Sequence, residues 1–250
     1  MSLPSKEEAR REGSMAFTVL VGLYTLVLFV LFFLITFLVW CCTAWWDKQR
    51  RIYHYSLCCW CRVYVFLMPI WKLRIEGREN LPQGACVLAP NHQSFLDIVV
   101  LFCLFYPFKW VAKHELFKLP LFGWILRLGG YISIRRGSSA DAARMLEESG
   151  DWLEKGMPIL MFPEGTRSRT GVVGRFRSGA FLLSARHGVP IVPIAMRGAL
   201  ETLQGGRVLC RRVVLRVCVL PPIAPPTTEG HVPPIQQAVE QLVRETVEAL

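Results

Sequence analysis

One uninterrupted apolar stretch near the N-terminus constrains the architecture of this chain more than any other feature. No charged residue occurs between residues 13 and 46, and residues 19–40 are almost wholly apolar. A helix needs about 20 apolar residues to cross the hydrocarbon core of a bilayer, so this stretch is long enough to span one with some tilt. It is also much longer than the roughly 7–15 apolar residues of a cleavable signal peptide. The sequence therefore predicts an N-terminal membrane-anchoring helix.

Aromatic and charged residues follow this stretch directly. Trp45 and Trp46 precede a short charged segment, a sequence typical of the level at which a helix leaves the hydrocarbon. Residues 52–71 are again rich in aromatic residues and carry only one charge, Arg62, which predicts an interfacial or re-entrant helix. Basic residues are nearly balanced on the two sides of the apolar stretch, so they leave its orientation open. We assign residues 1–70 to an N-terminal membrane anchor.

Composition narrows the class of partner. Hydrophobic residues make up 52% of the 250 residues and charged residues 19%, which argues against a disordered chain and favours contact with a membrane. The formal net charge is +10, so we expect anionic partners such as phosphate groups or an acidic membrane surface. The arginines are not interleaved with aromatic residues as in nucleic-acid-binding proteins, and we expect no nucleic-acid partner.

The nine cysteines show no regular spacing. They lie in or beside apolar segments, which predicts reduced, buried thiols in a cytosol-facing protein rather than a disulfide scaffold. Cys58, Cys59 and Cys61 form a cluster, for which a metal site is the alternative interpretation. Because no second ligand pair follows at a suitable spacing, we assign the cluster to packing or to the membrane interface and predict no metal.

From about residue 71 the pattern becomes that of a globular α/β domain, which we place at residues 71–250. Strand-like and helix-like segments alternate along it. Such alternation predicts a mixed, largely parallel sheet flanked by helices on both faces, here preceded by the membrane-anchoring helical segment. Ser138 or Ser139 is expected to cap one helix and Gly156 to end it. We expect strands at residues 71–75, 85–89, 158–162, 191–195 and 213–220, helices at 95–105, 139–155, 179–187 and 235–250, and a proline-rich surface loop at 221–226 and 233–234.

A histidine and a carboxylate follow the strand expected at residues 85–89. His92 lies at the strand's end, where open α/β sheets bind ligands, and Asp97 follows five positions later. Backbone dipoles at a helix start disfavour protonation of His92 and leave a base available. Five residues are about 140° apart on an ideal helix, so the pair can touch only if His92 precedes the helix. Asp97 would then orient the imidazole and stabilise its charged form. The alternative is a cap at Asn91 or Ser94, with His92 in a surface turn.

A second polar segment follows the strand expected at residues 158–162 and reads Phe-Pro-Glu-Gly-Thr-Arg-Ser. Gly165 lets the backbone approach a ligand, Thr166 offers a hydroxyl, and Arg167 offers a forked cation suited to phosphate. Taken alone, the segment has an alternative interpretation as a solvated turn in which Glu164 and Arg167 form a surface ion pair.

Together these segments resemble the four sequence blocks of the glycerolipid acyltransferase family, which contains lysophosphatidate and glycerol-3-phosphate acyltransferases. The resemblance is strongest to the lysophosphatidate (1-acylglycerol-3-phosphate O-acyltransferase) branch, in which lysine is usual at the position of Lys113. Arg135 departs from the family pattern, where an acidic or small polar residue is frequent. The blocks follow in the family's order as Asn91-His92-x-Ser94-x-x-Asp97, residues 130–136, residues 162–168 and residues 189–193.

The resemblance implies transfer of a fatty acyl chain from an acyl-CoA or acyl-carrier-protein thioester to the free sn-2 hydroxyl of lysophosphatidate, giving phosphatidate. His92 would take the hydroxyl proton and Asp97 would hold the imidazole, with no acyl-enzyme intermediate, no metal and no cofactor besides the thioester co-substrate. Cytosolic donors would require a membrane protein whose catalytic domain faces the cytosol. Another lysolipid acceptor, such as a lyso-ornithine lipid, and a non-catalytic lipid-binding protein are the alternatives. The implied phosphate-binding residues are Arg136, Glu164, Gly165, Thr166 and Arg167.

Other features stay outside these blocks. Residues 116–128, rich in Phe, Trp and Leu, are expected to dock on lipid, to line an acyl tunnel or to form a core helix. The motif Gly-x-Ser-x-Gly is absent, which disfavours a serine lipid hydrolase. The remaining histidines are expected to be structural or exposed.

Overall fold

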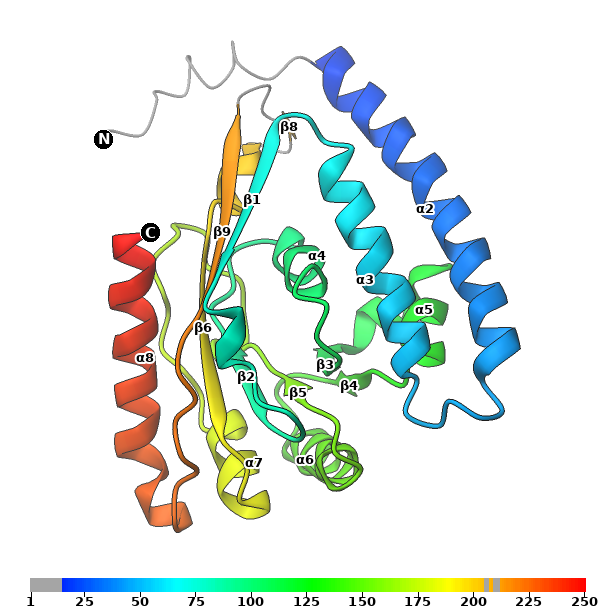
Figure 1. Ribbon diagram of the computed structural model, residues 1–250. Coiled ribbons are helices and arrows are strands. Elements are labelled where there is room, and N and C mark those ends of the chain that lie inside the picture. The colour runs from blue at the N-terminus through cyan, green and yellow to red at the C-terminus, as the bar shows by residue number, and fades with distance from the viewer. Residues whose placement is uncertain (1–14, 205–206, 209–211) are drawn as a thin grey trace.

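The structure is a computed structural model that describes residues 15–204, 207–208 and 212–250. Cys210, expected in a core segment, and the basic residues ahead of the apolar stretch lie outside these ranges. Figure 1 shows two long N-terminal helices lying beside an α/β body whose sheet is covered on both faces. The overall arrangement confirms the predicted fold class.

The apolar stretch forms helix α2, Met15–Thr43. Its span Thr18–Thr43 has a mean hydropathy of 2.8 and is long and apolar enough to cross a membrane, which makes it a candidate anchor. Asp47 lies in the connection between α2 and the next helix, α3, Arg51–Phe66. The Asp47 carboxylate accepts hydrogen bonds from the backbone amides of Arg51 (3.0 Å) and Ile52 (2.8 Å), two donors that a helix start leaves unpaired.

Helix α3 is shorter than the segment predicted at residues 52–71, and one side of it is buried in protein. Tyr53, Leu57 and Cys58 are buried and join the core beneath the sheet. His54 is also buried, and its ring nitrogens lie 3.0 Å from the Tyr131 hydroxyl and 3.0 Å from a backbone carbonyl oxygen. Helix α3 is therefore packed into the α/β body.

The main sheet has seven strands in the order β1-β9-β6-β2-β5-β3-β4. Neighbouring strands are parallel except for the β6–β9 pair. This confirms a mixed, largely parallel sheet, although sequence analysis missed β3 and β4 and overestimated the length of β5. A separate two-stranded sheet joins β7, Leu203–Gln204, to β8, Arg207–Val208. The main strands are β1 Trp71–Glu76, β2 Val87–Pro90, β3 Lys109–Lys113, β4 Ile132–Ile134, β5 Ile159–Leu160, β6 Ile191–Arg197 and β9 Val213–Val219.

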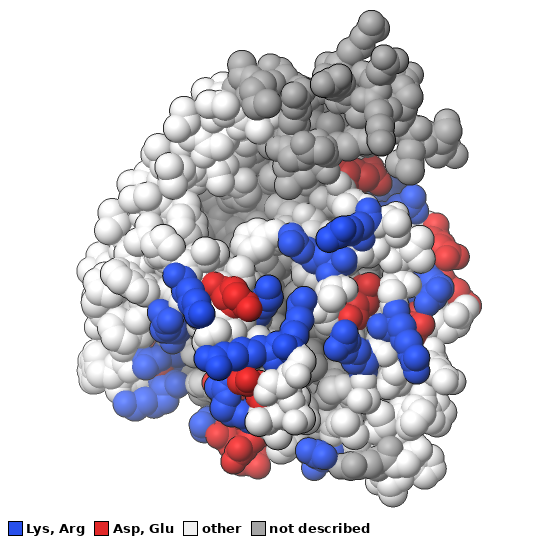
Figure 2. Space-filling view, turned by 180° about the vertical axis from the view of Figure 1, so that it is seen from behind, with Lys and Arg blue, Asp and Glu red and all other residues white. Residues whose placement is uncertain are grey.

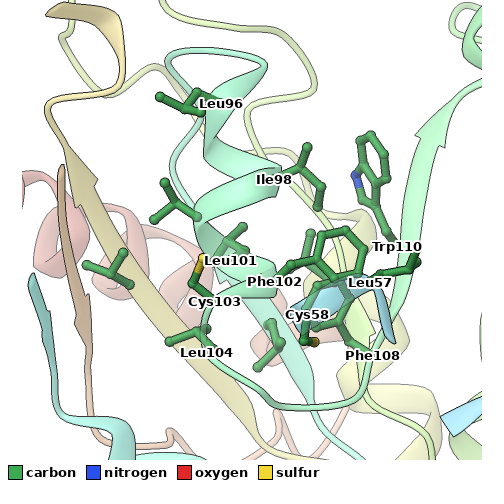
Figure 3. Close-up of a cluster of buried hydrophobic side chains, with 14 of the residues drawn as sticks. Leu57, Cys58, Leu96, Ile98, Leu101, Phe102, Cys103, Leu104, Phe108 and Trp110 are labelled. Carbon is green, nitrogen blue, oxygen red and sulfur yellow. The ribbon is translucent and has the colours of Figure 1, made fainter. Parts of the chain in front are cut away.

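Helices pack against both faces of the sheet and enclose two clusters of buried hydrophobic residues. One cluster joins α3, α4 and α5 to the sheet, and Figure 3 shows Leu57, Phe102 and Phe108 meeting there. The other lies under α6, α7 and α8. The helices are α4 Leu96–Phe102, α5 Phe122–Leu128, α6 Ser139–Glu154, α7 Gly179–His187 and α8 Val232–Ala249, with 3₁₀ turns η1 Arg78–Asn80, η2 His114–Lys118, η3 Leu200–Thr202 and η4 Glu229–His231.

Helix boundaries agree with the sequence where capping residues set them. The Ser138 hydroxyl accepts a hydrogen bond from the Asp141 amide (3.2 Å), which confirms the predicted cap of α6. The prediction that Pro233 and Pro234 lie in a surface loop is wrong, because both belong to the first turn of α8. Proline fits a first turn well, since the backbone N–H that it lacks has no partner there.

Candidate active site

The first three sequence blocks come together at one edge of the sheet, whereas the fourth, residues 189–193, lies at the amino end of β6. His92 follows β2 and the segment from Pro163 follows β5, and these two strands are neighbours. Arg136 follows β4, which is linked to β5 through β3 in the same parallel orientation. The carboxyl ends of parallel strands lie at the same edge, so the fold gathers residues that are far apart in sequence.

His92 and Asp97 are in direct contact. His92 Nδ1 lies 2.7 Å from Asp97 Oδ2, and the same oxygen accepts hydrogen bonds from the backbone amides of Gln93 (2.6 Å) and Ser94 (2.7 Å). The contact is possible because α4 begins only at Leu96, which leaves His92 in the preceding turn. The carboxylate is buried, while the imidazole keeps 14% of its surface exposed. With Nδ1 engaged, Nε2 is the ring nitrogen that can meet a substrate.

The alternative that leaves His92 in a surface turn is wrong, because Asp97 holds the imidazole. The Ser94 hydroxyl does accept a hydrogen bond from the Leu96 amide (3.3 Å) at the start of α4. Asn91 joins two strands instead: its side-chain amide donates to the Met196 carbonyl (3.0 Å) and accepts from the Met196 amide (2.7 Å). The His92 ring stacks on Phe162, with ring centroids 3.9 Å apart and planes inclined by 19°. The Asp97 hydrogen bond and the stacking on Phe162 together fix the orientation of the imidazole.

Glu164 holds the backbone of the site. One carboxylate oxygen accepts from the His92 amide (2.7 Å) and the other from the Gly174 amide (2.9 Å). Burial raises the pKa of the Glu164 carboxyl, while the two backbone amides oppose that rise. The Ser168 amide adds a 2.8 Å hydrogen bond to the His92 carbonyl. Both Glu164 oxygens are therefore engaged within the protein, and the proposed surface ion pair with Arg167 does not occur among the described residues.

Arginines converge beside this turn. Burial lowers the pKa of Arg136, the positive charges of Arg177 and Arg167 lower it further, and the negative charge of Glu115 opposes this shift. Arg177 lies against Gly165: a Cβ atom built on Gly165 would stand 3.0 Å from the Arg177 Nε. Gly165 has φ +68°, a conformation that side chains other than glycine's disfavour. Figure 2 shows Lys and Arg side chains gathered around a hollow on one face of the molecule.

Sequence analysis left Arg177 unassigned, because its only signal is membership of the arginine-rich segment after Arg167. Thr166 is exposed, in line with an accessible hydroxyl. Lys113, at the position where lysine is usual in the lysophosphatidate branch, lies 3.5 Å from Glu115 with both side chains about half exposed.

An apolar cavity of about 480 Å³ opens beside the histidine turn. Ser94 and Phe95 form part of its wall, and the N-terminal half of α2 forms another part. Phe122, Ile125 and Leu126 of α5 also line it, so this part of residues 116–128 joins the core and borders an apolar cavity. The volume falls within the range of small-molecule sites, roughly 300–1,000 Å³.

Comparison with known proteins identifies the family. A family model described as Acyltransferase matches residues 72–197. The chain belongs to the acyltransferase family. Among curated proteins, this chain is 36% identical over 163 residues to a chloroplastic 1-acyl-sn-glycerol-3-phosphate acyltransferase of Brassica napus, covering 64% of this chain and 47% of that protein. It is 37% identical over 150 residues to the enzyme of the same name from Pseudomonas aeruginosa, covering 58% of each.

The acyltransferase spans about half the length of the curated relatives it matches. Among solved structures, it is similar to the 1-acyl-sn-glycerophosphate acyltransferase PlsC of Thermotoga maritima, with a TM-score of 0.68, 23% identity, and coverage of 91% of this chain and 96% of that one. This likeness supports the fold. The family match includes every predicted site residue and also Arg177, but it ends before α8.

Proposed function

We propose that this acyltransferase transfers a fatty acyl chain from a thioester, acyl-CoA or acyl-carrier protein, to the free sn-2 hydroxyl of lysophosphatidate and produces phosphatidate. The observation that carries the proposal is the 2.7 Å contact between His92 and Asp97 at the sheet edge where the arginines converge. The names of the curated relatives supply the substrate class.

In the proposed mechanism, His92 Nε2 accepts the hydroxyl proton as the oxygen attacks the thioester carbonyl carbon. The carbon–sulfur bond then breaks, and the proton passes from the imidazolium to the leaving thiolate. Asp97 keeps the proton on Nδ1 and stabilises the transient positive charge. General-base catalysis of this kind contributes about 10²–10⁴-fold. Because thiolate is already a good leaving group, this step requires neither a metal nor a cofactor.

The proposed acceptor site binds phosphate through Arg136 and Arg167, with the Thr166 hydroxyl and the close backbone approach at Gly165. Glu164 acts as a positioning residue, since its oxygens already accept from two backbone amides and a carboxylate repels phosphate. The apolar cavity beside Phe95 suits a fatty acyl chain.

We propose residues 1–70 as the membrane anchor and residues 71–250 as the catalytic domain. Helix α2 would hold the site at the membrane, where a lysolipid is concentrated. Cytosolic thioester donors place the catalytic domain on the cytosolic side of that membrane.

The proposal is tested with the full chain purified in detergent and supplied with lysophosphatidate, lysophosphatidylcholine or lyso-ornithine lipid, each with acyl-CoA or acyl-carrier-protein donors. Mass spectrometry should detect phosphatidate as the fastest-forming product. Faster acylation of another lysolipid would show that this lysolipid, and not lysophosphatidate, is the preferred acceptor. Release of free fatty acid without a diacyl product would indicate a hydrolase, and lipid binding without turnover would indicate a non-catalytic protein.

A further inference from the structure

We infer that Arg177 is a third phosphate-binding cation of the acceptor site and that the C-terminal helix α8 positions it. The inference rests on the proposed function, because it assigns the contact to the phosphate of the lysolipid. It adds a binding residue and a positioning helix to a site whose sequence blocks contain neither.

The location of Arg177 supports the first part. Its guanidinium lies against Gly165, a residue of the proposed acceptor site. Of the positive charges that lower the pKa of Arg136, that of Arg177 has the largest effect. In the described part of the chain, no carboxylate pairs with Arg136, Arg167 or Arg177. Unpaired cations held close together repel one another, and a phosphate group between them removes that repulsion.

The segment that carries Arg177 is fixed at several backbone positions. The Arg177 amide donates to the Pro163 carbonyl (2.8 Å), and the Gly174 amide donates to Glu164 (2.9 Å). Between them, the Phe176 side chain is almost fully buried, with 1% of its surface exposed. The segment is therefore attached to the same carboxylate that holds the backbone of the catalytic histidine.

Helix α8 supplies the remaining contacts. Glu240 accepts a hydrogen bond from the Phe176 amide (2.8 Å), and the Gln236 side chain donates to the Phe176 carbonyl (2.9 Å). The other Glu240 oxygen accepts from Arg244 (2.8 Å), which fixes the carboxylate on the helix. Val239 and Val243 are fully buried and hold α8 against the sheet. Two side chains of α8 thus bind both backbone groups of the residue before Arg177.

The phosphate contact is tested by comparing Arg177→Gln with Arg175→Gln, a neighbouring exposed arginine that does not act on Arg136. With lysophosphatidate, the Arg177 variant should show a KM raised about tenfold or more, the usual effect of losing a hydrogen bond to a charged group. With 1-acyl-sn-glycerol, which lacks phosphate, its rate should equal that of the wild type. The Arg175 variant should leave both unchanged. An unchanged KM for lysophosphatidate in Arg177→Gln, or an equal loss with both acceptors, would overturn the assignment.

The positioning role is tested on the same acceptor. Glu240→Ala should raise the KM for lysophosphatidate about fivefold, and Glu240→Gln, which keeps an acceptor oxygen, should restore it. Glu245→Ala, on an exposed part of α8, is the matched control. Combining Glu240→Ala with Arg177→Gln should add nothing to the Arg177 effect, whereas additive effects would refute positioning. If the wild-type enzyme does not acylate lysophosphatidate, the proposed function is wrong. If the wild type acylates lysophosphatidate and the Arg177 and Glu240 variants have the same KM as the wild type, only this inference is wrong.

Discussion

Replacing Asp97 by asparagine separates the charge of the catalytic carboxylate from its shape. Asp97 Oδ2 accepts three hydrogen bonds, from His92 Nδ1 and from the amides of Gln93 and Ser94. An asparagine amide nitrogen in the Oδ2 position would place its N–H groups against three other hydrogen-bond donors. The asparagine oxygen should therefore occupy the Oδ2 position. The His92 tautomer and geometry are then retained, while the negative charge that stabilises the imidazolium is lost.

The size of the effect follows from this geometry. We expect kcat to fall about 10²–10⁴-fold, the full range of general-base catalysis, because no negative charge then stabilises the imidazolium that forms when His92 takes the proton. The new amide nitrogen would take the place of Asp97 Oδ1, which is buried and has no hydrogen-bond partner among the described residues. A buried unsatisfied donor costs about 1–3 kcal/mol of unfolding free energy.

The assay is the initial rate of phosphatidate formation, with urea unfolding of the same preparations to confirm the fold. Asp141→Asn is the control, since Asp141 lies in the first turn of α6 and pairs with Arg144 at 3.0 Å. A folded Asp97→Asn enzyme whose kcat stays within about tenfold of the wild type would refute the role of the carboxylate, since base catalysis exceeds that factor.

Three further predictions follow from particular contacts. Gly165→Ala and Gly188→Ala both place a side chain at positive φ, and each should lose about 1–2 kcal/mol of unfolding free energy. Only Gly165→Ala, whose new Cβ atom would lie 3.0 Å from Arg177, should raise the KM for lysophosphatidate. An equal KM for the two variants would contradict a role of the Gly165 backbone in phosphate binding. Gly22 borders the apolar cavity with open space beyond it, so Gly22→Leu should shift kcat/KM toward shorter acyl donors, whereas exposed Leu23→Phe should not. Burial lowers the pKa of Lys109 to about 7, while an unfolded lysine titrates near about 10.4. The unfolded chain then binds more protons between those values, so the stability that this group contributes rises with pH across that window and is lost as pH falls through about 7. The free energy of unfolding of Lys109→Met, measured in urea, should lack this rise. A pH dependence equal to that of the wild type would exclude this role of Lys109.

Much of the architecture could be predicted because its signals are local. The continuous apolar stretch of α2, the serine cap of α6 and Gly156, which follows the end of α6 at positive φ, each depend on neighbours within a few residues. The first and third sequence blocks also lie where strands end, and their contact follows from the parallel pairing of β2 with β5. For these parts the chain's own pattern was sufficient.

The features that were missed depend on distant contacts. Strand β3 begins with Lys109, which is 1% exposed and donates hydrogen bonds to the carbonyls of Gln49 (2.9 Å) and Gly129 (2.7 Å). A hydrophobicity pattern cannot anticipate a lysine in that place. The contact between Glu240 and Phe176 joins residues 64 positions apart, so nothing near Arg177 in sequence indicates what holds it. Similarly, the acidic character of Glu164 gave no sign that two backbone amides would occupy its oxygens.

The central claim is that His92 is the base that deprotonates the acceptor hydroxyl. The most direct measurement is the rate of phosphatidate formation by His92→Ala, folded and membrane-bound, with saturating lysophosphatidate and donor. The account predicts a fall of at least about 10²-fold with the thioester left intact. A His92→Ala protein that forms phosphatidate within about threefold of the wild-type rate, far less than base catalysis contributes, would contradict it.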